Sequence, residues 1–427
     1  MRVLFLTQYY PPEIGAAQHR LASWACTLKR AGHAVTVLTA LPNYPRGRIF
    51  EQYRGRMWME EEVAGIRVIR AWIYATKSKR FVPGVLSYLS FMVTATVLEM
   101  CRAGAQDWVV VEMPPLFLGI AGLLLSKLKR AKLVLNVSDL WPESAVALGV
   151  LRNRLVIRLA ELLGRFLYRQ ATLITGQTQG IVDGIRARCP EGVPVWLIPN
   201  GADVEAFLTT SQGDPSSGIR KEFGLEGKFV VGYAGLHGLA QGLETLIQAA
   251  RILADHKDVV FAFFGDGPEK ERLIRLSDEL HLTNVRFYPP QPSARMPEVY
   301  SLFDVALVPL KAHSLFKGAL PSKMFEAMAA GVPVVVAIRG EAQALMEQAE
   351  AGICVEPENA QAILQLYVDP ILRRRMGANG RRYVEQYFDR TEIARKFEQL
   401  LSQFDDVRGR VDVRGERVAR GAKNAER

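Results

Sequence analysis

The residues that carry the most chemical information lie between positions 321 and 331, where the sequence reads PSKMFEAMAAG. Lys323 can meet a phosphate as a point charge, and the Ser322 hydroxyl beside it can donate a hydrogen bond. Glu326 follows about one helical turn later, and its carboxylate can accept hydrogen bonds from both hydroxyls of a ribose. The alternative is an exposed Lys–Glu pair, which contributes roughly 0.2–0.5 kcal/mol to a helix.

A second polar group, SDLWPES at 138–144, follows an apolar run. The carboxylates of Asp139 and Glu143 and the indole of Trp141 form a set suited to binding a sugar. In the alternative interpretation Asp139 or its neighbour Ser138 caps a helix that begins in this segment. The pattern leaves both interpretations open.

Two glycine-containing loops also follow apolar runs. Gly15 precedes an expected helix, and GDGP at 265–268 follows the run at 259–264. Glycine lets a diphosphate or sugar approach the backbone, and a helix N-terminus adds partial positive charge. The loop with Gly15 does not read G-x-G-x-x-G, which argues against an ordinary dinucleotide site there. A plain turn is the alternative at each loop.

Strands and helices that alternate along the chain must position these residues. Because apolar strands alternate with helices in both halves, the sequence predicts an α/β fold with two Rossmann-like, doubly wound domains facing a central cleft. Strands are expected at 2–7, 34–40, 108–114, 132–139, 172–178, 229–235, 259–264, 285–290, 304–310 and 332–338, and helices at 18–30, 116–129, 153–169, 242–255, 268–280 and 322–330.

The same pattern divides the chain into five segments. We expect an N-terminal, acceptor-side domain, a polar linker, a nucleotide-sugar-binding domain, a helical segment that packs back on the first domain, and a disordered tail. The expected bounds are 1–207, 208–220, 221–380, 381–404 and 405–427.

Composition limits the class of protein. The four cysteines form no C-x-x-C pair and no cluster with zinc spacing, so we expect neither a disulfide framework nor a structural metal. The N-terminus lacks the features of a secretion signal, and a cytoplasmic location fits best. The net charge of +10 arises from the first half, which suggests an anionic partner there. A solubilising surface charge is the alternative.

Two helical segments raise the question of a membrane. Residues 81–98 carry no charge, and residues 152–169 intersperse arginines, including Arg152, Arg158 and Arg165, with large apolar side chains. The first segment is a buried helix, a transmembrane helix or a helix at a membrane interface, and the second favours the interface. Anionic lipid is the expected partner rather than nucleic acid, because no nucleic-acid-binding motif occurs.

The motifs together resemble those of family 4 retaining glycosyltransferases, which have the GT-B fold. The resemblance covers roughly residues 1–400. It rests on the loop with Gly15, on GHAVTV at 32–37, IPNGAD at 198–203 and GDGP at 265–268, and on the 321–331 segment. The 138–144 segment is similar to the subgroup that transfers N-acetylated aminosugars in O-antigen, capsule and exopolysaccharide assembly.

By this resemblance the second domain holds the nucleotide, with backbone around Phe287–Gln291 against the base, and Asp139 lies beside the reacting carbon. Members of the family usually need no metal, so we expect no cofactor besides the nucleotide-sugar donor, which we expect to be UDP-linked. The implied catalytic residues are Asp139, Lys323 and Glu326, and the implied donor-binding residues are Gly15, Arg20, Gly235, His237, Gly265, Tyr288, Gln291, Lys317, Ser322, Lys323 and Glu326. Trp141, Glu143, Arg152, Arg158 and Arg165 are expected on the acceptor and membrane side.

The chain departs from the family pattern at three positions. Where the family often has a glutamate eight residues before Glu326, this chain has Gly318, and where many members have a basic pair it has Leu236 and Gln241. We expect other cations, namely Lys323, Lys317, Arg20 and His237, to replace that pair.

The expected activity is transfer of a sugar, with retention of configuration, to a polyprenyl-diphosphate-linked or saccharide acceptor. The enzyme would act at the inner face of the cytoplasmic membrane as a peripheral protein. A nucleotide-sugar epimerase with the same fold and a non-catalytic subunit that binds sugar nucleotide or lipid are the alternatives.

Overall fold

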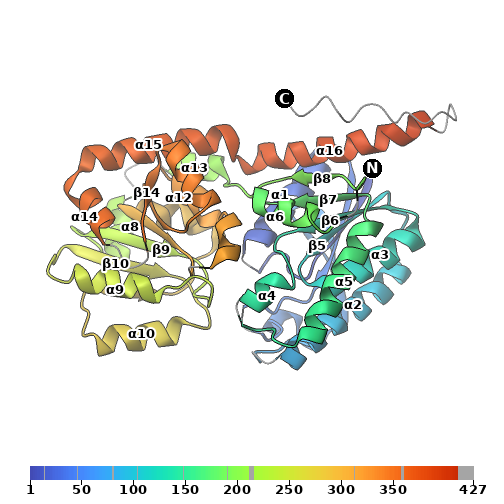
Figure 1. Ribbon diagram of the computed structural model, residues 1–427, viewed down its shortest axis with the longest axis horizontal. Helices are drawn as coiled ribbons and strands as arrows, with labels where there is room; N and C mark the ends of the chain where they lie inside the picture. Colours follow the sequence, from blue (N-terminus) through green and yellow to red (C-terminus); the bar gives the residue numbers. More distant parts are fainter. Residues whose placement is uncertain are drawn as a thin grey trace.

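The computed structural model describes residues 1–13, 15–45, 47–78, 81–102, 104–147, 149–189, 191–210, 216–311, 313–356 and 360–411. Two α/β domains lie side by side, and two long helices, α15 and α16, run along one side of both (Figure 1). The doubly wound architecture expected from the alternating pattern is confirmed.

The first domain is built on a sheet that, within the described residues, has eight strands in the order β3-β4-β2-β1-β5-β6-β7-β8. All neighbours are parallel except β3 and β4. The strands are β1 (Arg2–Leu6), β2 (Ala34–Ala40), β3 (Trp58–Val63), β4 (Ile66–Ala71), β5 (Trp108–Met113), β6 (Lys132–Val137), β7 (Leu173–Gly176) and β8 (Val195–Leu197).

Helices cover both faces of this sheet, as its apolar central strands require. Three of them, α2, α3 and α5, pack on one face, and α1 with the returning helix α16 packs on the other. The helices of this domain are α1 (Ala16–Arg30), α2 (Phe81–Arg102), α3 (Leu116–Lys129), α4 (Glu143–Ala147), α5 (Arg154–Gln170) and α6 (Gln179–Arg186), with a 3₁₀ turn, η1 (Glu51–Tyr53).

The second domain has a parallel sheet with the order β11-β10-β9-β12-β13-β14. Its strands are β9 (Phe229–Ala234), β10 (Val259–Phe264), β11 (Val285–Tyr288), β12 (Val305–Pro309), β13 (Val334–Ala337) and β14 (Gly352–Cys354). Its helices are α7 (Val204–Thr210), α8 (Ser216–Glu222), α9 (Glu244–Ile252), α10 (Lys270–Glu279), α11 (Met296–Ser301), α12 (Ser322–Ala329), α13 (Glu341–Ala349), α14 (Gln361–Val368) and α15 (Pro370–Tyr387), with 3₁₀ turns η2 (Ser293–Arg295) and η3 (Ser314–Gly318).

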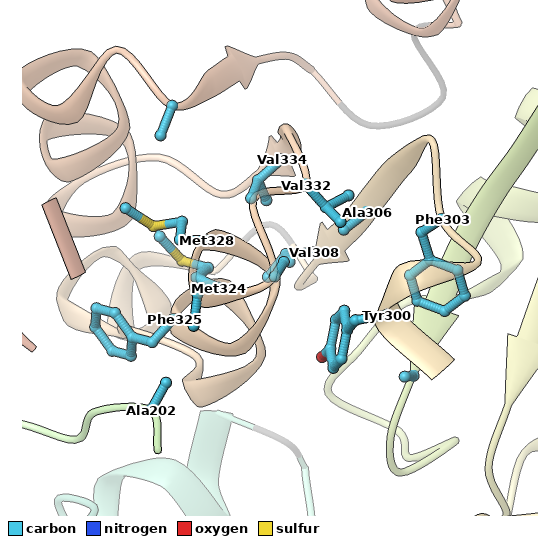
Figure 2. Packing of buried hydrophobic residues seen from close by; sticks show 14 of the residues in the cluster. Ala202, Tyr300, Phe303, Ala306, Val308, Met324, Phe325, Met328, Val332 and Val334 are labelled. Carbon is cyan, nitrogen blue, oxygen red and sulfur yellow. The ribbon is translucent and has the colours of Figure 1, made fainter. Parts of the chain in front are cut away.

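Helix α12 is anchored in the core of this domain by one face. The side chains of Met324, Phe325 and Met328 are fully buried. The two methionines lie towards strand residues Val308 and Val334 (Figure 2), and Phe325 stacks on Phe388 with ring centres 4.3 Å apart. Residues at positions i, i+1 and i+4 cover one side of a helix. The polar residues of the helix therefore lie on its other side.

The domain bounds expected from the sequence need correction. Val204 and Phe207, assigned to the first domain, pack in the core of the second. The expected linker, 208–220, overlaps the end of α7 and most of α8, and its residues 211–215 lie outside the described residues. A polar composition does not prevent short helices when one side of each contacts the core.

The C-terminal segment also differs from expectation. Residues 381–387 continue α15 and pack on the second domain, where Val384 is buried. Helix α16 (Arg390–Val411) then crosses to the first domain, where Phe397 stacks on Trp24 with ring centres 4.0 Å apart. Residues 405–411, expected to be disordered, continue this helix, and residues 412–427 of the expected tail lie outside the described residues.

Candidate active site

A cavity of about 1150 Å³ lies between the two domains. Its walls come from segments that follow the carboxyl ends of parallel strands in both sheets, which is where open α/β sheets bind ligands. The volume exceeds the roughly 300–1,000 Å³ of a site for one small ligand, so the cavity has room for two substrates. Residues along its walls include Gly15, His19, Tyr44, Arg48, Phe50, Arg54, Lys77, Asn200 and Asp203, then Gly235, Leu236, Gln241, Gly265, Gln291, Ser322, Lys323 and Glu326, and finally Arg390.

Lys323 stands in the first turn of α12, on the side that faces the cavity. Its Nζ atom donates a hydrogen bond to the Tyr233 hydroxyl at 2.6 Å and lies 4.2 Å from the centre of that ring. A Cβ atom at Gly235 would come within 3.0 Å of the same Nζ. Burial lowers the pKa of Lys323 to about 8. The group is therefore largely charged at neutral pH and placed to attract an anion.

Glu326 follows one turn later on the same side of the helix. The Tyr300 hydroxyl donates to its Oε2 atom at 3.1 Å. Among the described residues, no other side chain or backbone group donates a hydrogen bond to this carboxylate. Burial raises the pKa of Glu326, and the nearby Arg390 guanidinium opposes that rise. The carboxylate keeps acceptor positions for two ligand hydroxyls.

Two glycines bring the loops after β9 and β10 together. Gly265 has φ of +145°, and a Cβ atom there would lie 1.9 Å from the Gly235 carbonyl oxygen. Only glycine permits this backbone contact. Three of the expected donor-binding positions, Gly15, Gly235 and Gly265, line the cavity.

Arg390 is a cavity residue that the sequence did not reveal. It begins α16, where its backbone N–H donates to the Ala202 carbonyl at 2.9 Å. Its side chain donates twice to the Gly201 carbonyl, at 3.2 and 3.0 Å. Burial lowers the pKa of Arg390, and the charge of Glu326 opposes this effect. A cation from the crossing helix thus stands near the predicted ribose ligand.

Arg20 was expected to bind the donor, and this needs correction. Its guanidinium is buried, does not line the cavity, and donates to Asn200 at 2.5 Å, to Glu112 at 2.6 Å and to Ser138 at 2.8 Å. A buried arginine needs such partners. Of these, Asn200 lines the cavity, so Arg20 supports a residue of the wall and does not face the cavity itself.

Three other expected donor residues also lie away from the cavity. His237 is fully buried, and burial lowers its pKa to about 4, so the neutral ring cannot replace a missing cation. The Tyr288 hydroxyl donates to the Phe223 carbonyl at 2.8 Å, while nearby Gln291 does line the cavity. Lys317 is exposed outside it.

The polar side chains of the 138–144 segment make their contacts within the first domain. Burial raises the pKa of Asp139 to about 6, and its carboxyl is hydrogen-bonded to the Ser144 side chain and the Leu140 backbone. Glu143 forms an ion pair with Arg188 at 2.6 Å. Neither these carboxylates nor Trp141 lines the cavity. Helix α4 begins at Glu143, so neither Ser138 nor Asp139 stands at its N-cap, and the Ser138 hydroxyl instead bonds to Arg20 and Glu112.

The departures from the family pattern have structural consequences. Leu236 and Gln241 do line the cavity, so the wall is uncharged at both positions. At Gly318, a Cβ atom would lie 3.0 Å from the Cα atom of Gly180 in the other domain. Next to it, the Glu341 carboxylate accepts the backbone N–H of Gln179 at 3.0 Å and that of Gly180 at 2.5 Å. Glycine at 318 therefore makes room for direct contact between the domains.

Helices α2, α3 and α5 lie together on one face of the first sheet (Figure 1). Outside the cavity, these helices expose large apolar side chains. They include Val82, Leu86, Val93, Val97, Met100, Leu124, Leu128, Leu155, Leu159, Leu162 and Phe166. Arg152, Arg158 and Arg165 are exposed in the same region. Among the described residues, one helix, Val82–Arg102, is long and apolar enough to cross a membrane, and 22% of its apolar window is buried.

Sequence comparison matches each domain to a family model. Residues 15–201 match the glycosyl transferase 4-like domain, and residues 217–383 match glycosyl transferases group 1. The chain is also 27% identical over 420 residues to WcaI of Escherichia coli K12, a protein named as a glycosyl transferase of colanic acid biosynthesis. This alignment covers 96% of the chain and 100% of WcaI.

Solved structures with the same fold cover nearly the whole chain. Sucrose-phosphate synthase from Thermosynechococcus elongatus superposes with a TM-score of 0.74 at 19% identity, covering 95% of this chain and 100% of that one. HepE of Anabaena, solved in complex with UDP-glucose, superposes with a TM-score of 0.70 at 19% identity, covering 94% and 100%. With both domains matched and the fold shared, the chain belongs to the family 4 glycosyltransferases of the GT-B fold.

Proposed function

We propose that this glycosyltransferase takes a sugar from a UDP-sugar and transfers it, with retention of anomeric configuration, to a hydroxyl of a lipid-linked or saccharide acceptor in surface polysaccharide biosynthesis. The observation that carries the proposal is the pairing of Lys323 and Glu326 on the cavity side of α12. An ammonium for a diphosphate and a carboxylate for a ribose stand one turn apart, beside glycine backbone at Gly235 and Gly265.

In this proposal the donor diphosphate lies between Lys323 and the backbone of Gly15 and Gly235. Charge develops on the diphosphate as the glycosidic bond breaks, and the ammonium with the α12 N-terminus stabilises it. A leaving phosphate oxygen then accepts the proton of the acceptor hydroxyl. No carboxylate base is required, which agrees with the position of Asp139 outside the cavity.

Support for uridine comes from HepE, whose structure contains UDP-glucose. Support for polysaccharide assembly comes from WcaI, named for colanic acid biosynthesis. The N-acetylated aminosugar rests on the resemblance of the 138–144 segment alone. We further propose that the reaction needs no metal, so transfer should persist in EDTA.

The exposed apolar side chains of α2, α3 and α5, with their arginines, support a peripheral location on an anionic membrane surface. Apolar contact and electrostatic attraction act together in such binding. The acceptor would then reach the enzyme from the lipid side.

A panel of UDP- and GDP-sugars, tested first by thermal shift and then for nucleotide release, checks the proposal. We expect a UDP-sugar to stabilise the protein and UDP to be released only when acceptor is present. Conversion of a UDP-N-acetylhexosamine without acceptor would instead indicate the epimerase, and binding without any turnover would indicate the non-catalytic subunit.

A further inference from the structure

The first-domain wall of the cavity carries a group of cations that donor binding does not use. Arg48, Arg54 and Lys77 all line the cavity and are exposed to it. They follow β2 and β4, at the carboxyl edge of the first sheet. The proposed nucleotide-binding side chains, Lys323 and Glu326, belong by contrast to the second domain, and the first domain contributes only the backbone of Gly15 to the proposed donor site. These cations therefore belong to the half of the cavity left for the acceptor.

A glycine brings two segments of this wall into contact. Gly47 has φ of +59°, and a Cβ atom there would lie 2.3 Å from the Thr76 carbonyl oxygen and 2.8 Å from the Lys77 nitrogen. Because only glycine tolerates this approach, the backbone beside Arg48 is held against the backbone of Lys77. The two cations come from segments about 30 positions apart in the sequence and are brought to one place.

The loop that carries Arg48 is fixed at both ends. The Phe50 N–H donates to the Pro42 carbonyl at 2.9 Å, which closes the loop. The buried Glu13 carboxylate accepts the backbone N–H groups of Asn43 and Tyr44, at 2.8 and 2.7 Å. A loop held in this way loses little conformational entropy when its side chains bind a ligand.

Two of the three cations have no counter-ion. Arg48 and Lys77 form no hydrogen bond or ion pair through their side chains among the described residues, while Arg54 meets Glu51 at 3.7 Å. An anionic ligand in this part of the cavity would supply the missing counter-charge. A phosphate or diphosphate group offers the charge and the acceptor oxygens that these side chains require.

Helix α2, which follows Lys77 in the sequence, carries a stripe of exposed apolar side chains. Lys77 precedes the helix by four positions, and Val82, Leu86, Val93 and Val97 are all more than half exposed along it. The spacing of these residues keeps them on one side of the helix. A molecule with an anionic head and an apolar chain would match first the cations in the cavity and then the apolar side chains of α2.

We propose that Arg48 and Lys77, assisted by Arg54, form the phosphate subsite for the acceptor, whose lipid chain leaves the cavity along α2. This inference rests on the proposed function and names the acceptor class: a lipid that carries its phosphate or diphosphate next to the sugar or hydroxyl to be extended. A free phosphate or diphosphate shares the head-group chemistry and must be distinguished by experiment.

The test is equilibrium binding of farnesyl diphosphate to the full-length protein with the donor site saturated by UDP. We expect the Arg48→Gln/Lys77→Gln double variant to bind farnesyl diphosphate at least about tenfold more weakly, because two charge-assisted contacts are lost, and to bind UDP unchanged. Arg56→Gln is the matched control, since Arg56 is exposed nearby but does not line the cavity. Gly47→Ala should weaken binding as well while keeping both charges.

Several outcomes separate the possibilities. Equal binding of farnesyl diphosphate by the wild type and the double variant would overturn the subsite, as would equal binding of uncharged farnesol. Inorganic diphosphate binding as tightly as farnesyl diphosphate would overturn the lipid part. Failure of the wild-type protein to bind UDP would count against the proposed function instead, because the proposed UDP site does not include Arg48, Arg54 or Lys77.

Discussion

Glu326 offers the sharpest test of how the donor is held, because its role can be isolated with a change in the ligand. The carboxylate has four acceptor positions, and the Tyr300 hydroxyl occupies one of them. If the ribose hydroxyls take two of the others, Glu326→Gln loses a charged acceptor facing a hydroxyl donor. Hydrogen bonds of this kind contribute about 1–3 kcal/mol, so we expect the Kd for UDP to rise about 5- to 150-fold.

The assay is calorimetric titration of the wild type and Glu326→Gln with UDP and with 2′-deoxy-UDP. The wild type should prefer UDP by roughly tenfold, and the variant should lose most of that preference, which gives a coupling energy of about 1 kcal/mol or more. Tyr300→Phe is the matched control, since it removes the hydroxyl that contacts Glu326 and leaves the carboxylate in place.

The fold should survive this substitution. Burial raises the pKa of Glu326, which means that the folded protein disfavours its charged form relative to the unfolded chain. The neutral glutamine relieves that cost, so we expect no fall in melting temperature at pH 7. If Glu326→Gln keeps the full preference for UDP over 2′-deoxy-UDP, the ribose assignment is refuted.

The other predictions concern charge, domain contact and the membrane. Burial lowers the pKa of Lys323 to about 8, so kcat/KM should fall about tenfold per pH unit above pH 8 as the ammonium loses its proton. In Lys323→Arg this alkaline loss should disappear, because arginine stays charged. A wild-type profile that is flat to pH 10 would contradict the assignment. Glu341→Ala removes the carboxylate that accepts two backbone N–H groups of the other domain. The unliganded protein should therefore shift towards an open form by about 1–3 kcal/mol, which X-ray scattering would detect as a larger radius of gyration. An unchanged radius would argue against this contact in solution. Leu159→Ser/Phe166→Ser should reduce flotation with anionic vesicles at low salt, whereas Ile252→Ser, equally exposed on the second domain, should not; no flotation of the wild type would refute the membrane proposal.

The repeating fold and the part of the cavity wall formed by α12 could be predicted from the sequence because both depend on local patterns. Apolar runs alternating with helices specify doubly wound sheets, and the loops after the strands then meet at one edge. The 321–331 segment combines an apolar side, buried through Met324 and Phe325, with Lys323 and Glu326 on the other side. The helical period of about 3.6 residues assigns the apolar residues to one side of the helix and the polar residues to the other.

What could not be predicted depends on pairings between distant residues. Arg390 reaches the cavity because Phe388 and Arg390 pair with Ala202, 186 or more positions earlier, and nothing near Arg390 in the sequence indicates this. Arg20 looked like a free cation, but it is neutralised by the buried Glu112, whose sequence position is 92 residues away. The burial of His237 likewise follows from tertiary packing around its ring.

At 138–144, the residue types alone do not identify what the side chains contact. Asp139, Trp141 and Glu143 have the residue types of a sugar site, yet their partners are Ser144, Arg188 and the backbone. Spacing alone does not distinguish a helix start from a binding loop, because both use short polar side chains to satisfy backbone N–H groups.

Retaining transfer from a UDP-sugar held between the two domains is tested most directly by proton NMR analysis of the product. Incubation of the wild-type protein with an α-linked UDP-N-acetylhexosamine and a farnesyl diphosphate-linked sugar should release UDP and form a new α-glycosidic bond, and Lys323→Met should remove this activity. A β-linked product, or conversion of the UDP-sugar without acceptor, would contradict the account.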